Sequence, residues 1–65
     1  MKILLWEIRN RYNISLNKLS RQTGISKSTL QRIETGATSP TLDKLELIAK
    51  AMKIKITDLF DSEYK

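Results

Sequence analysis

The chain has 65 residues and a net charge of +5, and it contains neither cysteine nor histidine. A chain of this length forms one small domain, so we expect residues 1–65 to fold as a single unit. Without cysteine or histidine there is no disulfide, and nothing favours a metal, a cofactor or an enzyme. No apolar run approaches the roughly 20 residues that span a bilayer, and we expect a cytoplasmic protein without a membrane partner.

The excess positive charge is confined to residues 1–40. This part carries seven basic and two acidic side chains, whereas residues 41–65 carry five of each. Such an excess favours a polyanionic partner, although surplus lysines also keep small proteins soluble.

Two helices are expected in the N-terminal part. The first covers about residues 2–12, where Leu5, Ile8 and Tyr12 recur at helical spacing. The second begins after Ser15, a good N-cap residue, and ends at Gly24, which readily adopts the positive φ that stops a helix. One narrow face of this second helix carries Leu16, Leu19, Ser20 and Thr23.

A third helix is expected from Ser26, again an N-cap residue, to about Thr35, with Gly36 ending it. At about 100° per residue, Leu30 and Ile33 fall on one side of this helix and must face the core. The opposite side faces outward. We call its residues the reading face: Lys27, Ser28, Gln31 and Arg32.

A fourth helix is expected from about Thr41, and a fifth, short one over Thr57–Asp61. The apolar face of the fourth helix consists of Leu42, Leu45, Ile48, Ala49 and Met52. Leu59 and Phe60 return the chain to the core, and no strand is predicted. The single tryptophan, Trp6, either covers Phe60 and Tyr64 as part of the core or belongs to a dimer contact.

The side chains of the reading face suit the edges of DNA bases. Arginine can donate two hydrogen bonds to guanine, glutamine can pair with adenine, and serine and lysine can bond to several edges. Ordinary exposed helices are also polar, so this face does not decide the function alone. The glycine turn before the helix, the N-capped helix that precedes it and the uneven charge all favour DNA.

Residues at many fixed spacings point to one known family. They are Leu19, Gly24-Ile25-Ser26, Ser28-Thr29-Leu30, Arg32-Ile33-Glu34, Gly36, Pro40, Leu42, Ile48-Ala49-Lys50-Ala51 and Leu59-Phe60. With them the chain resembles the Cro/C1-type helix-turn-helix family, also called the XRE family. The resemblance implies an all-α, compact, five-helix, lambda-repressor-like domain with its helix-turn-helix at residues 15–35. It also implies that the reading face contacts bases in the major groove.

The resemblance further implies contacts with DNA phosphates from the start of the second helix and from the loop after the third. The residues expected to make phosphate contacts are Ser15, Asn17, Lys18, Arg21, Ser26, Thr35, Thr38 and Ser39. Leu16 replaces a phosphate-binding glutamine common in the family, and the loop lacks the usual basic residues. Hydroxyl groups, backbone N–H groups and Asn17 or Lys18 would have to serve instead.

Three features concern stability. The family often pairs an arginine of the first helix with the glutamate at the end of the third, so we expect Arg9 and Glu34 to form a structural ion pair. Leu16 is assigned to packing. Lys53 and Lys55 stand where relatives tend to have a helix-ending glycine and an N-cap serine, which predicts weaker capping there.

Together these observations predict a sequence-specific regulator of transcription that binds double-stranded DNA, in particular a repressor that occupies an operator. Family members commonly bind pseudo-palindromic sites as two-fold dimers, which implies a homodimer on DNA. The alternative is an antitoxin-like or other protein-interaction module on the same fold. No small-molecule ligand is evident.

Overall fold

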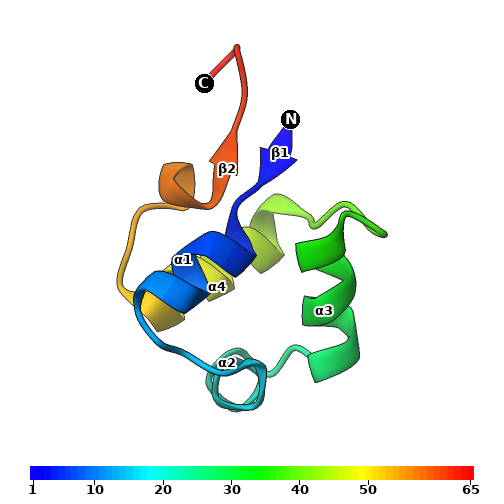
Figure 1. The fold of residues 1–65 in the computed structure, drawn as a ribbon, viewed down its shortest axis with the longest axis vertical. Helices are drawn as coiled ribbons and strands as arrows, with labels where there is room; N and C mark the ends of the chain where they lie inside the picture. Colours follow the sequence, from blue (N-terminus) through cyan, green and yellow to red (C-terminus); the bar gives the residue numbers. More distant parts are fainter.

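The computed structural model describes all of residues 1–65. Four α-helices form the body of the molecule, and two short strands project from it together with both chain ends (Figure 1). None of the helices has the length and apolar character needed to cross a membrane. The elements in chain order are β1 (Lys2–Ile3), α1 (Leu5–Arg11), α2 (Leu16–Thr23), α3 (Lys27–Thr35), α4 (Leu42–Met52), the 3₁₀ turn η1 (Ile56–Leu59) and β2 (Phe60–Asp61).

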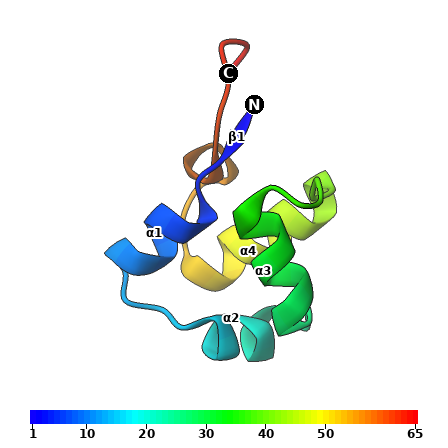
Figure 2. The same ribbon diagram turned by 45° about the vertical axis from the view of Figure 1, so that its right-hand side comes forward.

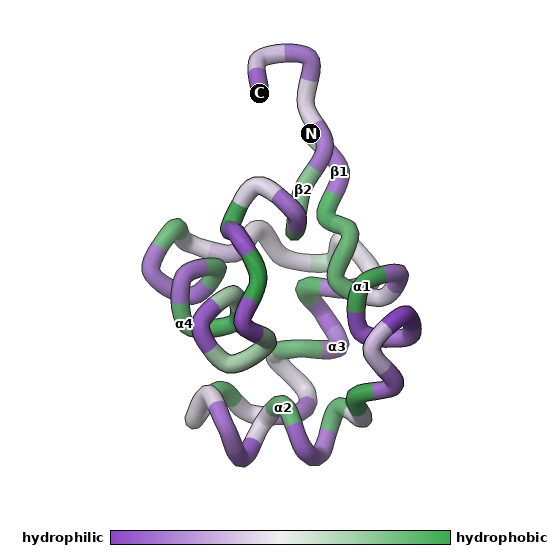
Figure 3. The backbone as a smooth tube through the Cα atoms, turned by 90° about the vertical axis from the view of Figure 1, so that its left-hand side faces the viewer, coloured by the Kyte–Doolittle hydropathy of each residue, from purple (hydrophilic) through white to green (hydrophobic).

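A single apolar core joins all the helices. Every buried residue is apolar, and each helix contributes at least one of them. In Figure 3, the hydrophobic residues of α2 lie on the side that faces the body, and its hydrophilic residues lie on the outer side. Full burial of one leucine or isoleucine stabilises the fold by about 1.5–3 kcal/mol, so the six that are essentially inaccessible dominate the core. These six are Leu5, Leu19, Leu30, Ile33, Ile48 and Leu59.

The predicted starts of the three central helices are confirmed by their capping hydrogen bonds. Ser15 Oγ accepts a bond from the N–H of Lys18 at 3.0 Å, and Ser26 Oγ accepts one from the N–H of Thr29 at 3.2 Å. Thr41 caps α4 in the same manner. Such caps satisfy N–H groups that have no partner inside the helix.

The predicted ends of α2 and α3 are also confirmed. Gly24 and Gly36 adopt φ values of 76° and 81°, the left-handed region that glycine enters without steric cost. At the end of α4, however, Lys53 occupies the same region with a φ of 58°. Lys55 supplies no side-chain cap to η1. The N–H of Lys55 instead donates to Asp58 Oδ2 at 3.3 Å, and the weaker capping at these two lysines stays a prediction about stability.

The prediction that the chain has no strand was wrong. β1 and β2 pair antiparallel, with Lys2 opposite Asp61 and Ile3 opposite Phe60. The N–H of Leu4 continues the pairing by donating to Leu59 O at 2.8 Å. This pairing draws the first residues out of the predicted first helix, which consequently begins at Leu5 and not near residue 2. Strands of two residues are too short to show an alternating pattern in the sequence.

The prediction of five helices was also wrong in its count. The structure has four α-helices, and the expected fifth is the single 3₁₀ turn η1. Only four residues separate Lys55 from Phe60, and Phe60 is already extended because it pairs with β1. The chain therefore completes one tight turn there, enough to bury Leu59.

Three large apolar side chains lie outside the core: Trp6, Leu42 and Tyr64. The exposure of Leu42 is contrary to the prediction, whereas that of Trp6 excludes the first of the two alternatives given for it and leaves the dimer contact untested. Trp6 is 56% exposed and Tyr64 is 90% exposed, so the tryptophan does not close the core over that tyrosine. Leu5 and Ile8 face inward, which turns Trp6 towards solvent. Leu42 is 74% exposed, since it starts α4 beyond the edge of the core. Leu16, by contrast, packs partly buried against the core as predicted.

Candidate nucleic-acid interface

The turn between α2 and α3 is fixed by side-chain hydrogen bonds. Ser20 Oγ donates to the carbonyl oxygen of Ile25 at 2.6 Å. Thr23 Oγ1 donates to Leu19 O at 2.8 Å and accepts a bond from the N–H of Ile25 at 3.1 Å. Ile25 is itself buried, so the turn is held from both the polar and the apolar side. The angle between the two helices is consequently set by the turn and by the core together.

The two sides of α3 differ as its periodicity predicts. Leu30 and Ile33 are completely buried, whereas all four residues of the reading face are exposed. Figure 2 shows α3 along one side of the molecule, with α2 at its N-terminal end and the loop to α4 at its C-terminal end. The reading face is therefore presented outward by a helix whose opposite side is anchored.

Three hydroxyl groups form a small network at the start of α3. Ser26 Oγ donates to Thr29 Oγ1 at 2.8 Å while it caps the helix. The Oγ atoms of Ser26 and Ser28 lie 3.4 Å apart. The hydroxyl hydrogen of Ser26 is thus already used inside the protein. Of the three, Ser28 is the one on the reading face, and its oxygen keeps lone pairs for a further bond.

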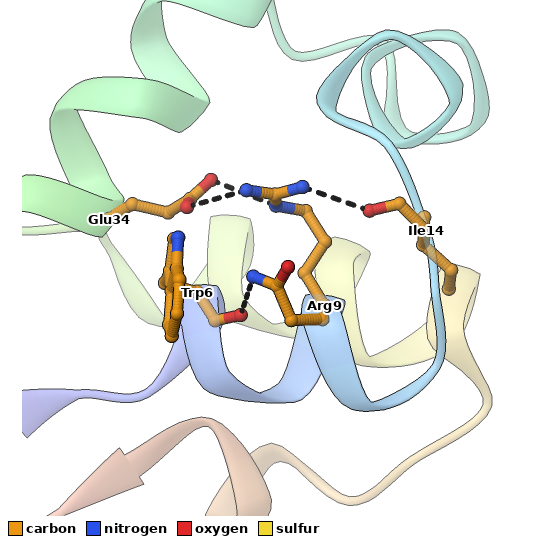
Figure 4. A network of polar contacts seen from close by, with 5 residues as sticks. Trp6, Arg9, Ile14 and Glu34 are labelled. Carbon is orange, nitrogen blue, oxygen red and sulfur yellow. Dashed lines mark hydrogen bonds and ion pairs between the residues drawn. The ribbon is translucent and has the colours of Figure 1, made fainter.

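The predicted ion pair between Arg9 and Glu34 is present and ties three segments together (Figure 4). Arg9 Nε and Nη2 donate to the two carboxylate oxygens of Glu34 at 3.1 and 3.0 Å. Its Nη1 donates to Ile14 O at 3.1 Å. The side chains of Arg9 and Glu34 are only 15% and 6% exposed. This forked geometry holds the C-terminal end of α3 on α1 and on the segment that leads into α2.

The cations near α2 and α3 have no acidic partner. The ion pairs of the structure are Arg9 with Glu34 and the exposed pair of Lys2 with Glu7. The cations left without a carboxylate in this region are Lys18, Arg21, Lys27 and Arg32, all of them exposed. An unneutralised group of this kind attracts a polyanion.

The structure distributes the predicted phosphate-contacting residues over three places, one of which is the N-cap of α3, where Ser26 is exposed. Ser15, Asn17 and Lys18 are exposed together at the start of α2, and Arg21 is exposed in its last turn. At the other end of α3, Thr35 and Ser39 are exposed and Thr38 is partly buried. Thr35 Oγ1 donates to Arg32 O at 3.2 Å, so its hydroxyl hydrogen is already used.

One basic residue near the loop after α3 was not predicted from the sequence. Lys44 lies in the first turn of α4 and lines a hollow together with residues of α3 and of the loop. The available signal was the N-cap Thr41, three residues earlier, which fixes the place of Lys44 in the helix. Sequence reasoning looked for basic residues within the loop itself and so passed over a lysine that follows it.

Comparisons with known proteins agree with this geometry. A helix-turn-helix family model matches residues 7–59. The HTH-type transcriptional regulator SlrR of Bacillus subtilis is 38% identical over 56 residues, which are 85% of this chain and 37% of SlrR. The uncharacterized HTH-type transcriptional regulator YgzD of the same organism is 35% identical over 60 residues, 92% of this chain and 91% of YgzD.

A solved structure shares the fold. The N-terminal DNA binding domain of SinR from Bacillus subtilis superposes with a TM-score of 0.78 at 24% identity, covering 94% of this chain and 90% of that domain. The chain spans well under half of SlrR but nearly all of YgzD. The chain belongs to the helix-turn-helix family of the Cro/C1 type, because the family model matches most of its length and the structure contains the anchored α2–turn–α3 unit.

Proposed function

We propose that the chain is a transcriptional regulator that binds double-stranded DNA sequence-specifically, with α3 in the major groove. The reading face carries this proposal, because its four polar side chains are exposed on a helix fixed in the core. The major groove admits one α-helix and presents a distinct pattern of donors and acceptors for each base pair. The names of SlrR and YgzD, both HTH-type transcriptional regulators, support the same function.

Each residue of the reading face has a role that follows from its chemistry. Arg32 donates two hydrogen bonds to one guanine, and Gln31 pairs with the exposed edge of an adenine. Lys27, at the start of α3, bonds to a guanine or to a phosphate. Ser28 donates one hydrogen bond to a base edge or accepts one from it. The neighbouring Ser26 sets the position of the Ser28 hydroxyl group.

The flanking residues hold the domain on the phosphate backbone and set the register of α3. Ser15, Asn17 and Lys18 would do so at the start of α2, with Arg21 adding charge in its last turn. Ser26 would contact a phosphate at the N-terminus of α3, where the positive end of the helix dipole attracts an anion. At the other end of α3, the contacts would come from Thr35, Thr38 and Ser39.

The domain would act as a repressor when its operator overlaps a promoter, since occupancy alone then blocks transcription. One chain has one reading face and therefore reads one half-site. Two copies related by a two-fold axis would read two half-sites about 34 Å apart on one side of the duplex. A homodimer on a pseudo-palindromic operator is the form we propose for the complex.

Selection of bound duplexes from a random DNA pool tests this function. We expect enrichment of a short sequence in inverted repeat, with half-site centres about one helical turn apart. A promoter that carries the selected site should then be repressed in a reporter assay. Recovery of no enriched sequence, together with weak binding that ignores sequence, would contradict the proposal and favour a protein-interaction module.

A further inference from the structure

The side of α4 that points away from the core carries both apolar and charged side chains. α4 forms one side of the molecule, with α1 on the opposite side (Figure 3). Counted at about 100° per residue from its first residue, the four buried residues of α4 fall between about 240° and 340°. A second group of residues falls between about 0° and 140°, and all of them are exposed. We call this group the α4 outer face: Leu42, Asp43, Glu46, Leu47 and Lys50.

Two leucines are exposed on the α4 outer face. Leu42 is 74% exposed and Leu47 is 45% exposed. The other large apolar residues that are exposed lie on α1, directly after it and at the two ends of the chain. Single exposed leucines are common on protein surfaces. The charges that lie between these two leucines therefore decide what the face can bind.

These charges are divided along the helix. Asp43 and Glu46 lie in the N-terminal half of α4, and Lys50 lies in its C-terminal half. None of the three forms an ion pair within the protein, although Glu46 and Lys50 are four residues apart, the spacing at which helical pairs form. The face is consequently complementary to itself when it is turned end over end. An antiparallel copy brings its own Lys50 opposite the two carboxylates.

We infer that the α4 outer face is the contact between two copies of the chain, with the two α4 helices antiparallel. A two-fold axis makes such a contact isologous, so each ion pair between Lys50 and a carboxylate occurs twice. Leu47 lies near the middle of α4 and packs against Leu47 of the second copy. The inference rests on the homodimer proposed above, and it names the surface that forms this homodimer.

The contact leaves the reading face of each copy free. α3 lies on the core side of α4, because Leu30 and Ile33 belong to the same core as Leu45 and Ile48. The α4 outer face points away from this core. Two copies joined through it therefore have their α3 helices on opposite sides of the contact, as the reading of two separate half-sites requires.

The size of the contact indicates that it forms on DNA. A helix of 11 residues is about 16 Å long and about 10 Å wide, so one face buries on the order of 300 Å² per copy. A stable interface buries about 800 Å² per partner. The free protein should therefore sediment as a monomer at micromolar concentration. On DNA, two neighbouring half-sites hold the copies together and should be occupied cooperatively.

Exchange of charges between copies tests the contact. D43K combined with E46K makes the charges of the face wholly basic, and K50E makes them wholly acidic. Binding is measured by fluorescence anisotropy on duplexes with one or two selected half-sites. The wild type should show a cooperativity of about 5–150-fold, as for a typical coupling between sites. Each variant alone should lose most of it, because like charges then face each other.

An equal mixture of the two variants should recover the cooperativity, since the basic face of one copy then meets the acidic face of the other. An effect confined to a single helix cannot be recovered by mixing. Circular dichroism of each variant shows that it is folded. If the mixture binds no more cooperatively than its components, the inference is overturned, while binding to single half-sites keeps the proposed function.

Two truncations compare the α4 outer face with α1. Leu47→Ser should reduce cooperativity, whereas Trp6→Ser, which shortens an exposed side chain of α1, should not. The opposite result would place the contact on α1 and overturn the inference. A dimer that persists in free solution in all the charge variants would also place it elsewhere. A wild type that prefers no duplex sequence would contradict the proposed function, and the inference with it.

Discussion

Substitution of Arg32 distinguishes recognition of bases from general electrostatic attraction to DNA. Arg32 is exposed, has no acidic partner and carries the only guanidinium of the reading face. Arg32→Ala should cost about 1–3 kcal/mol of binding free energy on the selected duplex, because a forked contact with one base is lost. On a random duplex the loss should be much smaller. Equilibrium titrations on both duplexes measure the difference.

Lys18 is the matched control for Arg32. It is exposed at the start of α2 and also has no acidic partner, but it lies off the reading face. Lys18→Ala should weaken binding to both duplexes alike, as expected for a phosphate contact. An equal loss on both duplexes for Arg32→Ala would remove Arg32 from base recognition.

The end of α4 differs from the ends of α2 and α3. α2 and α3 end at glycines, whereas α4 ends at Lys53 with a φ of 58°. A side chain in the left-handed region costs about 1–2 kcal/mol, which glycine avoids. Lys53→Gly should therefore stabilise the domain by about 1 kcal/mol and raise Tm by about 4–8 °C. Thermal unfolding followed by circular dichroism measures the shift.

The opposite result is expected one turn earlier in the same helix. Lys50 has ordinary helical surroundings, so Lys50→Gly should destabilise the domain by about 1 kcal/mol. If both glycine variants lowered Tm, the strain assigned to Lys53 would not exist. DNA affinity should be unchanged by Lys53→Gly, since this end of α4 lies away from α3.

For the whole molecule, the largely buried ion pair between the side chains of Arg9 and Glu34 is the polar contact expected to matter most for stability. Loss of one partner from a buried pair costs about 3–5 kcal/mol, because the other charge is left unpaired. A domain of this size has a free energy of unfolding of about 3–10 kcal/mol. Glu34→Ala should therefore remove much of the stability of the domain, and urea denaturation measures the loss.

Two variants show whether burial is the cause. Glu7→Ala breaks the exposed pair of Glu7 and Lys2, in which the side chains are 41% and 72% exposed, respectively. It should lower the free energy of unfolding by less than about 1 kcal/mol. Replacing both partners, as in Arg9→Met with Glu34→Leu, should recover most of the stability that Glu34→Ala loses. No recovery in the double variant would mean that the network with Ile14 matters more than the unpaired charge.

The charge of the complex as a whole predicts a steep response to salt. With about 6–10 phosphate contacts per dimer, affinity should fall by about 10³–10⁵ between 50 and 200 mM salt. Fluorescence anisotropy of a labelled duplex measures this dependence. A flat response would contradict binding to the phosphate backbone and favour a protein partner.

The sequence alone determined most of the helical framework and the outward direction of the reading face. Helix starts at Ser15, Ser26 and Thr41 depend on bonds to residues three positions away. The burial of Leu30 and Ile33 follows from the same short spacing. Such local relations can be predicted from a sequence because helix formation depends on neighbours within one turn.

Only the tertiary structure decided what depends on distant parts of the chain. The pairing of Ile3 with Phe60 shortened α1 and left η1 as a single turn, and the packing at the edge of the core left Trp6 exposed. Lys44 and Arg32 likewise line one hollow because the loop after α3 brings the start of α4 next to the C-terminal half of α3. These arrangements arise when separate segments meet in the folded core, and no periodicity of either segment contains them.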